Sequence, residues 1–125
     1  MTASTPQELQ TRFLELFLNN DLDGLLSLYE DTAVFVLQGG ESAVGTAGIR
    51  EALSGLLGIA QKFDLVPSFA VEVDGVALMH GNWSLEGVDP AGNPLSLGGT
   101  TIEVARRQAD GSWLYSVDSP FGVIA

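Results

Sequence analysis

The C-terminal half of the sequence predicts four β-strands joined by short turns. Apolar runs in this half are separated by Asp74-Gly75, by the proline- and glycine-containing segment 89–94, and by Asp110-Gly111. Asp-Gly between apolar runs is a strong hairpin signal, because such turns need positive φ angles at their central residues. We therefore expect four successive strands, at residues 62–73, 76–86, 95–107 and 112–117.

Three amphipathic helices are predicted ahead of these strands. The first begins after Thr5, which can cap it, with Pro6 in its first turn and Glu8 at the capping-box position. Asp21 is expected to cap the second helix and Thr46 the third. Apolar residues at helical spacing form one face of each helix: Leu9, Phe13, Leu16 and Phe17; Leu22, Leu25, Leu26 and Tyr29; and Ile49, Ala52, Leu53, Leu56, Leu57 and Ala60.

Two segments between these elements carry weaker signals. Residues 33–37 are a short continuous apolar run, which is typical of a strand covered on both faces. Residues 38–45 are rich in glycine but lack the lysine of a phosphate-binding loop, so we expect a connecting loop. Pro67 cannot donate to a strand ladder and therefore indicates a bulge or a sheet edge.

Composition limits the classes of partner. The chain has 125 residues and 46% hydrophobic residues, which fits one folded domain at residues 1–125. Its net charge of −11 disfavours nucleic acid and anionic membranes as partners. The absence of cysteine excludes disulfides and thiol catalysis, and the single histidine gives no recognisable metal spacing. The first residues lack the pattern of a signal peptide, so we expect a cytoplasmic protein.

Several motifs together resemble those of a known family. These are Asn20-Asp21-Leu22-Asp23-Gly24-Leu25, Leu28-Tyr29-Glu30-Asp31-Thr32-Ala33-Val34, Gly45-Thr46-Ala47-Gly48-Ile49-Arg50-Glu51, Arg106-Arg107-Gln108-Ala109-Asp110-Gly111-Ser112-Trp113 and Val117-Asp118-Ser119-Pro120-Phe121-Gly122. They resemble ketosteroid-isomerase-like proteins of the nuclear transport factor 2-like superfamily, including its SnoaL-like branch of polyketide cyclases and uncharacterised members. The resemblance implies a cone-shaped α+β roll (cystatin-like), with three N-terminal helices against a strongly curved, mostly antiparallel sheet. It also implies a pocket at the open end and a homodimer through the outer face of the sheet.

The residues of a steroid isomerase are not all present. By this resemblance, Phe13 occupies the position of the tyrosine that would stabilise an oxyanion, and Leu37 occupies the position of the base. The remaining acid maps to Glu103 or Val104. Neither a phenyl ring nor a leucine side chain can take over the missing role, so isomerisation by that mechanism is not expected.

Other polar side chains are candidates for acid–base chemistry. Glu103 lies in an otherwise uncharged strand segment; it either points into the pocket, where burial would raise its pKa, or lies on the outer face. Tyr115 and Tyr29 could each donate a hydrogen bond to a ligand or satisfy a core carbonyl. Strand alternation puts His80 on the face opposite Trp83. The resemblance implies that Trp83 lies on the concave side, so His80 is expected at an interface or on the surface. Asp118, just past the last strand, is expected to cap a turn.

The expected pocket is mainly apolar, and we expect no cofactor or metal in it. Its predicted lining residues are Phe13, Phe17, Phe35, Met79, Trp83 and Val117. Such a pocket would bind a small hydrophobic molecule, with isomerase, cyclase or dehydratase-type chemistry if Glu103 acts as an acid or base. The alternative is a non-catalytic ligand-binding or dimeric protein-interaction module, whose interior is filled by core side chains.

Overall fold

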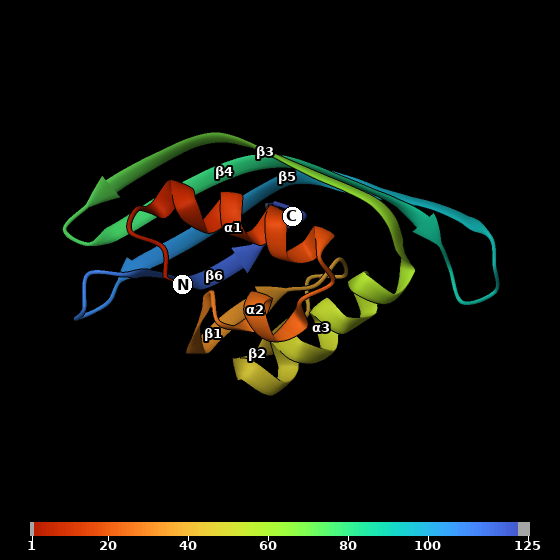
Figure 1. Cartoon of the computed structure of the whole chain (residues 1–125), viewed down its shortest axis with the longest axis horizontal. Helices are drawn as coiled ribbons and strands as arrows, with labels where there is room; N and C mark the ends of the chain where they lie inside the picture. Colours follow the sequence, from red (N-terminus) through yellow and green to blue (C-terminus); the bar gives the residue numbers. More distant parts are fainter. Residues whose placement is uncertain (1, 123–125) are drawn as a thin grey trace.

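The computed structural model describes residues 2–122, which form three helices packed on one face of a six-stranded sheet (Figure 1). The helices are α1 (Pro6–Leu18), α2 (Leu22–Leu26) and α3 (Gly45–Ile59). The strands are β1 (Tyr29–Val36), β2 (Ser42–Val44), β3 (Ala60–Val73), β4 (Val76–Val88), β5 (Pro94–Arg107) and β6 (Trp113–Ser119). The predicted α+β architecture is confirmed.

The order of strands in the sheet is β2-β1-β6-β5-β4-β3, so the last four strands form the predicted antiparallel succession. Asp74 and Gly75 have φ angles of 50° and 78°, as the turn between β3 and β4 requires. The first strand β1 pairs antiparallel with β2 and parallel with β6, which makes the sheet mixed. This parallel pair brings together strands that lie far apart in the sequence, and no local sequence pattern predicts it.

The curvature of the sheet is weaker than the resemblance implied. The long strands β3, β4 and β5 bend over α1, but in Figure 1 they form a gently arched layer and not a strongly curved cone. Pro67 meets both expectations for it, because β3 is an edge strand and its pairing with β4 shifts between Pro67 and Phe69. Within the described residues, no helix is both long enough and apolar enough to span a bilayer.

Two of the three predicted helix caps are present. The Thr5 hydroxyl accepts a hydrogen bond from the Glu8 amide, and the Asp21 carboxylate accepts one from the Gly24 amide. The prediction for Thr46 was wrong, since the cap position of α3 is Val44, two residues earlier, and its side chain makes no cap hydrogen bond. The second helix ends at Leu26, so Tyr29 lies in β1 and not on the apolar face of a helix.

The core lies between the helices and the inner face of the sheet. Leu9 and Phe13 of α1 and Leu53 of α3 are buried there. Inward-facing residues of the sheet complete the core, among them Met79, Trp83, Leu85, Ala105 and Tyr115. Each large apolar side chain that is fully buried contributes about 1.5–3 kcal/mol to stability, so this layer holds α1 and α3 firmly over the sheet.

Candidate functional site

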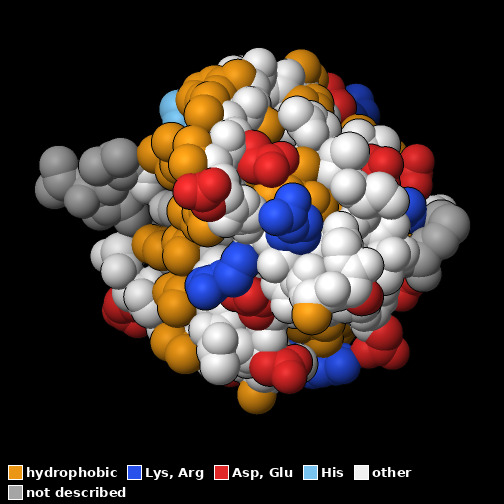
Figure 2. Space-filling view, turned by 90° about the vertical axis from the view of Figure 1, so that its left-hand side faces the viewer, with side chains coloured by type: hydrophobic (Ala, Val, Ile, Leu, Met, Phe, Trp, Pro, Cys, Tyr) orange, Lys and Arg blue, Asp and Glu red, His pale blue; other side chains and the backbone are white. Residues whose placement is uncertain are grey.

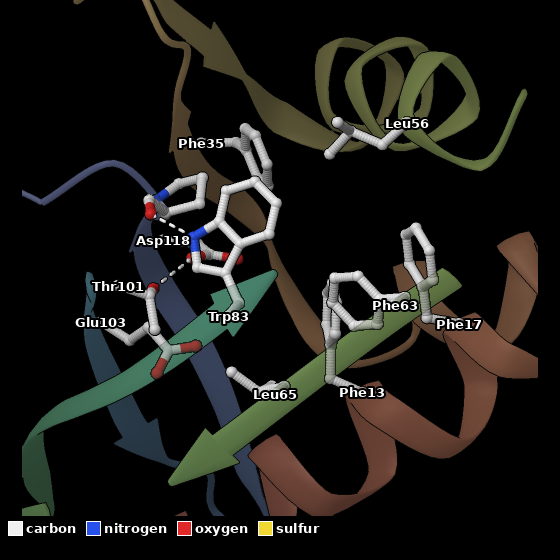
Figure 3. A pocket seen from close by; sticks show the side chains of 11 residues that line it. Phe13, Phe17, Phe35, Leu56, Phe63, Leu65, Trp83, Thr101, Glu103 and Asp118 are labelled. Carbon is white, nitrogen blue, oxygen red and sulfur yellow. Dashed lines mark hydrogen bonds between the residues drawn. The ribbon is translucent and has the colours of Figure 1, made fainter. Parts of the chain in front are cut away.

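A small pocket lies in this core between α1, α3 and the sheet (Figure 3). Its volume is about 30 Å³, far below the roughly 300 Å³ at which pockets for drug-sized ligands begin. The residues that line it are Phe13, Phe17, Phe35, Leu56, Phe63, Leu65, Trp83, Thr101, Glu103, Asp118 and Pro120. The lining is mainly apolar, but it includes two carboxyl groups on neighbouring strands.

Glu103 projects into this pocket from the middle of β5. It pairs with Asp118 of β6 across the ladder, and only 3% of it is exposed. Its Oε1 atom accepts a hydrogen bond of 2.7 Å from Nε2 of Gln10. Burial and the negative charge of Asp118 raise the pKa of Glu103 to about 8, while hydrogen bonding from Gln10 opposes the increase. Glu103 is therefore largely protonated at neutral pH.

Asp118 lies in β6 and faces the same pocket, so the prediction that it caps a turn beyond the last strand was wrong. The Tyr29 hydroxyl donates to its Oδ2 atom at 2.5 Å, and Thr101 donates to Oδ1 at 3.4 Å. Burial raises the pKa of Asp118 to about 6, and the hydrogen bonds from Tyr29 and Thr101 limit the rise. Asp118 is thus mostly ionised at neutral pH.

A bulge in β6 explains the position of Asp118. Ala105 of β5 pairs with Tyr115 and Val104 pairs with Val117, so β6 contains one extra residue, Ser116. Strict alternation would place Tyr115 and Asp118 on opposite faces of the sheet. Because Ser116 forms a bulge and takes no place in the alternation, Tyr115 and Asp118 both face inward. Alternation counted along the sequence alone does not show this.

Tyr29 and Tyr115 are buried but do not line the pocket, and their ring centroids are 5.2 Å apart. Burial is the main cause that raises the pKa of each hydroxyl, so both stay protonated as hydrogen-bond donors. Tyr29 donates to Asp118. The Tyr115 hydroxyl makes no hydrogen bond to the described residues, although it lies close enough to Glu103 to lower the pKa of that carboxyl.

The predicted lining residues divide into three groups. Phe13, Phe17, Phe35 and Trp83 line the pocket, and Trp83 also donates from Nε1 to the Pro120 carbonyl. Met79 is buried as the cross-strand neighbour of Glu103 but does not line the pocket. Val117 pairs with Val104 on the outer side of the sheet and is not part of the lining.

His80 also lies on the outer side of the sheet, where its ring is 4.4 Å from that of Phe69. Its side chain therefore does not face the carboxyl pair. In the region that the structure describes, no group of three or more potential ligand side chains is placed to hold a metal ion.

Two polar residues of the site were not predicted from the sequence. Gln10 is 1% exposed and Thr101 is 3% exposed, and each is hydrogen-bonded to one of the two carboxyl groups. Gln10 follows Pro6 by four residues and precedes Phe13 and Phe17 at helical spacing, so it lies on the buried stripe of α1. A polar residue in such a stripe is the signal that could have identified it.

A wider groove adjoins the pocket. It lies between α3 and the β1–β2 hairpin, has a volume of about 610 Å³, and shares Phe35 and Leu56 with the pocket lining. Its other lining residues are Leu37, Gln38, Ser42, Ala43, Val44, Gly48, Glu51, Ala52, Gly55, Leu97 and Phe121. A volume of this size suits a drug-sized molecule, whereas the pocket beside the carboxyl groups does not.

The fold and sequence were compared with those of known proteins. The sequence profile of the SnoaL-like domain matches residues 11–115. No curated protein sequence matches the chain. A ketosteroid isomerase-like protein from Erwinia carotovora atroseptica superposes with a TM-score of 0.81 at 16% identity, over 95% of this chain and 94% of that one.

Two further solved structures have the same fold. A conserved protein from Planctomyces limnophilus gives a TM-score of 0.79 at 21% identity, over 92% of this chain and 91% of that one. A candidate SnoaL-like polyketide cyclase from Shewanella denitrificans gives 0.69 at 16% identity, over 94% of this chain and 90% of that one. At such identities the likeness shows a shared fold and does not show a shared reaction.

Proposed function

Because the chain belongs to the SnoaL-like domain family, we propose that it is an acid–base enzyme acting on a small hydrophobic molecule. The observation that carries this proposal is the pair of buried carboxyl groups, Glu103 and Asp118, on facing strand positions in an apolar pocket. Different neighbours separate their pKa values to about 8 and about 6. Between these values one group holds a proton while the other can accept one, which suits acid–base catalysis.

The proposed reaction is proton transfer next to a carbonyl group. Asp118 removes a proton from the carbon adjacent to the carbonyl, and Glu103 gives its proton to the carbonyl oxygen as an enol forms. In each outcome Glu103 takes its proton back from the enol oxygen. The proton on Asp118 then goes to another carbon in an isomerisation, to the oxygen of a second carbonyl that the enol carbon attacks in a cyclisation, or to a hydroxyl group that leaves as water in a dehydration. Tyr29 stabilises the ionised form of Asp118 and so keeps it ready to accept a proton.

The adjoining groove supplies the space that the pocket lacks. We place the body of the substrate in the groove and its carbonyl end in the pocket, with Phe35 and Leu56 at the junction. Glu51 lines the groove and the chain carries a net charge of −11, so an uncharged substrate is favoured over an anionic one. None of these steps requires a cofactor.

The alternative function is non-catalytic binding or protein interaction. The small volume of the pocket, about 30 Å³, is the observation in its favour, because a filled interior leaves no room for a substrate beside the carboxyl groups. In that case the groove alone would hold a ligand, and the protonation of Glu103 would serve only to lower the cost of its burial.

We also propose that a second copy of the chain covers the outer face of the sheet. Exposed apolar side chains gather there on β3 and β4: Phe69, Val71, Val73, Val76 and Leu78. Figure 2 shows a band of hydrophobic side chains running down one side of the molecule. Two chains of net charge −11 repel one another, so this apolar patch of the sheet is where two copies can approach.

Deuterium uptake from solvent tests the proposed reaction without knowledge of the product. The protein would be incubated in D₂O with neutral cyclic ketones such as 2-tetralone, and exchange next to the carbonyl would be followed by NMR. We expect the chain to accelerate exchange, and expect Asp118→Asn and Glu103→Gln to lose the acceleration. Binding without accelerated exchange, equal in all three proteins, would favour the non-catalytic alternative.

A further inference from the structure

Gln10 is the only described residue of α1 whose side chain hydrogen-bonds to either carboxyl group of the pair. Its Nε2 atom donates to two acceptors, Oε1 of Glu103 at 2.7 Å and the main-chain oxygen of His80 at 3.0 Å. The side chain is 1% exposed, so water does not compete for these contacts. One amide nitrogen therefore joins the helix to β4 and β5 at once.

The second of these contacts determines which way the amide of Gln10 points. A main-chain oxygen can only accept a hydrogen bond, so His80 requires the nitrogen of Gln10, and not its oxygen, at this position. The same nitrogen then presents its other hydrogen to Oε1 of Glu103. A proton on this oxygen would make it a hydroxyl oxygen, which accepts hydrogen bonds more weakly than the carbonyl oxygen of the acid, so the hydrogen bond from Gln10 favours the proton on the other oxygen.

We propose that Gln10 is a positioning residue that confines the transferable proton of Glu103 to its Oε2 atom. This inference rests on the proposed function, in which Glu103 is the proton donor. Gln10 determines which of the two carboxyl oxygens of Glu103 carries the proton. Without Gln10, the proton of Glu103 can lie on either carboxyl oxygen, so the carboxyl group has two protonated arrangements. With Gln10, a single arrangement is available to a bound molecule, which shortens the search for a productive geometry.

Other groups around Glu103 must be separated from Gln10 in any test. Asp118 and Tyr115 of β6 are the titratable groups that shift the pKa of Glu103, and the charge of Glu103 in turn raises the pKa of Tyr29 in β1. Asp118 acts in the opposite direction to Gln10, because its charge raises the pKa of Glu103. Tyr115 acts in the same direction as Gln10, so a change of pKa alone does not identify Gln10 as its source.

The side-chain amide of Gln10 provides a direct readout in the unaltered chain. We expect its ¹H and ¹⁵N resonances to shift as the pH passes the midpoint of Glu103, which is about 8. The shift should be lost in Glu103→Gln. The amide of Gln7, exposed one turn earlier on the same helix, is the control and should not report this titration. A Gln10 amide that is insensitive to this titration overturns the proposal.

A pair of variants tests the effect on the proton itself. The protonated carboxyl of Glu103 would be followed by its C=O stretching band in infrared spectra, assigned by its loss in Glu103→Gln. Gln10→Met keeps the length of the side chain but removes the donor, so the midpoint should rise by about one pH unit and the band should broaden as a second arrangement appears. Gln7→Met should change neither. An unchanged midpoint and band in Gln10→Met contradicts the proposal.

Neither readout needs a substrate, so this inference and the proposed reaction can fail separately. A responsive Gln10 amide without accelerated deuterium uptake would remove the proposed reaction and keep the role of Gln10 in placing the proton. Accelerated uptake with an unresponsive amide would keep the reaction and remove the role of Gln10.

Discussion

Glu103 and Asp118 are cross-strand partners on β5 and β6, and both side chains turn to the same apolar pocket although they have different hydrogen-bond donors. Glu103 accepts from an amide and Asp118 from two hydroxyl groups. Two carboxyl groups so placed do not both ionise readily, because each charge opposes the other in a poorly solvated site. The pair therefore holds one proton around neutral pH, and four predictions about the chain follow from this pair and its surroundings.

The first prediction concerns stability against pH. The pKa of Glu103 is raised from 4.5 when unfolded to about 8 when folded, so the folded state binds this proton more tightly. The free energy of unfolding should therefore be highest below pH 4.5, as far as Glu103 is concerned, and should fall as the pH rises through about 8. Glu103→Gln, which mimics the protonated form, should lose less stability over this range in urea titrations.

The control for this prediction is Glu15→Gln, on the exposed side of α1. It makes the same change of charge without altering the pocket, so its stability should keep the pH dependence of the unaltered chain. Equal pH profiles for Glu103→Gln and Glu15→Gln would contradict the assignment of Glu103 as a buried acid.

The second prediction separates the two tyrosines. The hydrogen bond from Tyr29 lowers the pKa of the Asp118 carboxyl. Tyr29→Phe removes this hydrogen bond, so the midpoint of Asp118 should rise above about 6. The lost hydrogen bond to a charged group should also cost about 2 kcal/mol in the free energy of unfolding above that midpoint. NMR titration of the aspartate carboxyl carbon measures the shift.

Tyr115→Phe is the matched variant. Its hydroxyl influences Glu103, so the substitution should raise the midpoint of Glu103 and leave that of Asp118 near its original value. If both variants shift the same carboxyl, the two hydroxyl groups do not have the separate roles that the structure gives them.

The third prediction tests the groove with two glycines of α3. Gly55 lines the groove and Gly58 does not, and a Cβ added at either would meet nothing within 4 Å. Both Gly→Leu substitutions should stabilise the helix by about 1 kcal/mol. Only Gly55→Leu should fill the groove and abolish the thermal shift given by a bound ketone. Equal ligand responses in the two variants would place the ligand elsewhere.

The fourth prediction concerns the outer face. Leu78 is 45% exposed and lies among the apolar side chains of β3 and β4. Leu78→Lys should place a buried charge in each copy of the proposed dimer and so shift the chain to a monomer in light scattering after size-exclusion chromatography. Leu18→Lys, at a 61% exposed position on α1, should leave the mass unchanged. A monomeric unaltered chain at high concentration would rule out the proposed dimer.

Local signals predicted much of the fold. The turn at Asp74-Gly75 defines the β3–β4 hairpin by its own backbone preferences, and Asp21 caps α2 as its side chain allows. The resemblance to the SnoaL-like branch was confirmed by the match over residues 11–115. What could not be predicted depends on distant residues, as in the parallel pairing of β1 with β6. The short strand β2 was missed for the same reason, since it exists only through its pairing with β1.

The candidate site was less predictable than the fold. Glu103 stood out as a charge in an uncharged segment, but its direction depended on strand register. Asp118 was misplaced because the last strand was expected to end at residue 117, whereas β6 continues to Ser119 and its bulge at Ser116 turns Asp118 inward. Gln10 could have been identified as a polar residue in the apolar stripe of α1. Its hydrogen-bond partner Glu103, however, lies 93 residues further along the chain.

The extra residue in β6 has a consequence for how relatives of this chain are aligned. In a chain that lacks the counterpart of Ser116, the residues aligned with Tyr115 and Asp118 are two positions apart, so simple alternation directs both to the inner face. One that keeps it can carry an inward acid at a position where simple alternation expects an outward one. Relatives with and without the extra residue can therefore present the same inward acid, two positions after the tyrosine in one case and three positions after it in the other.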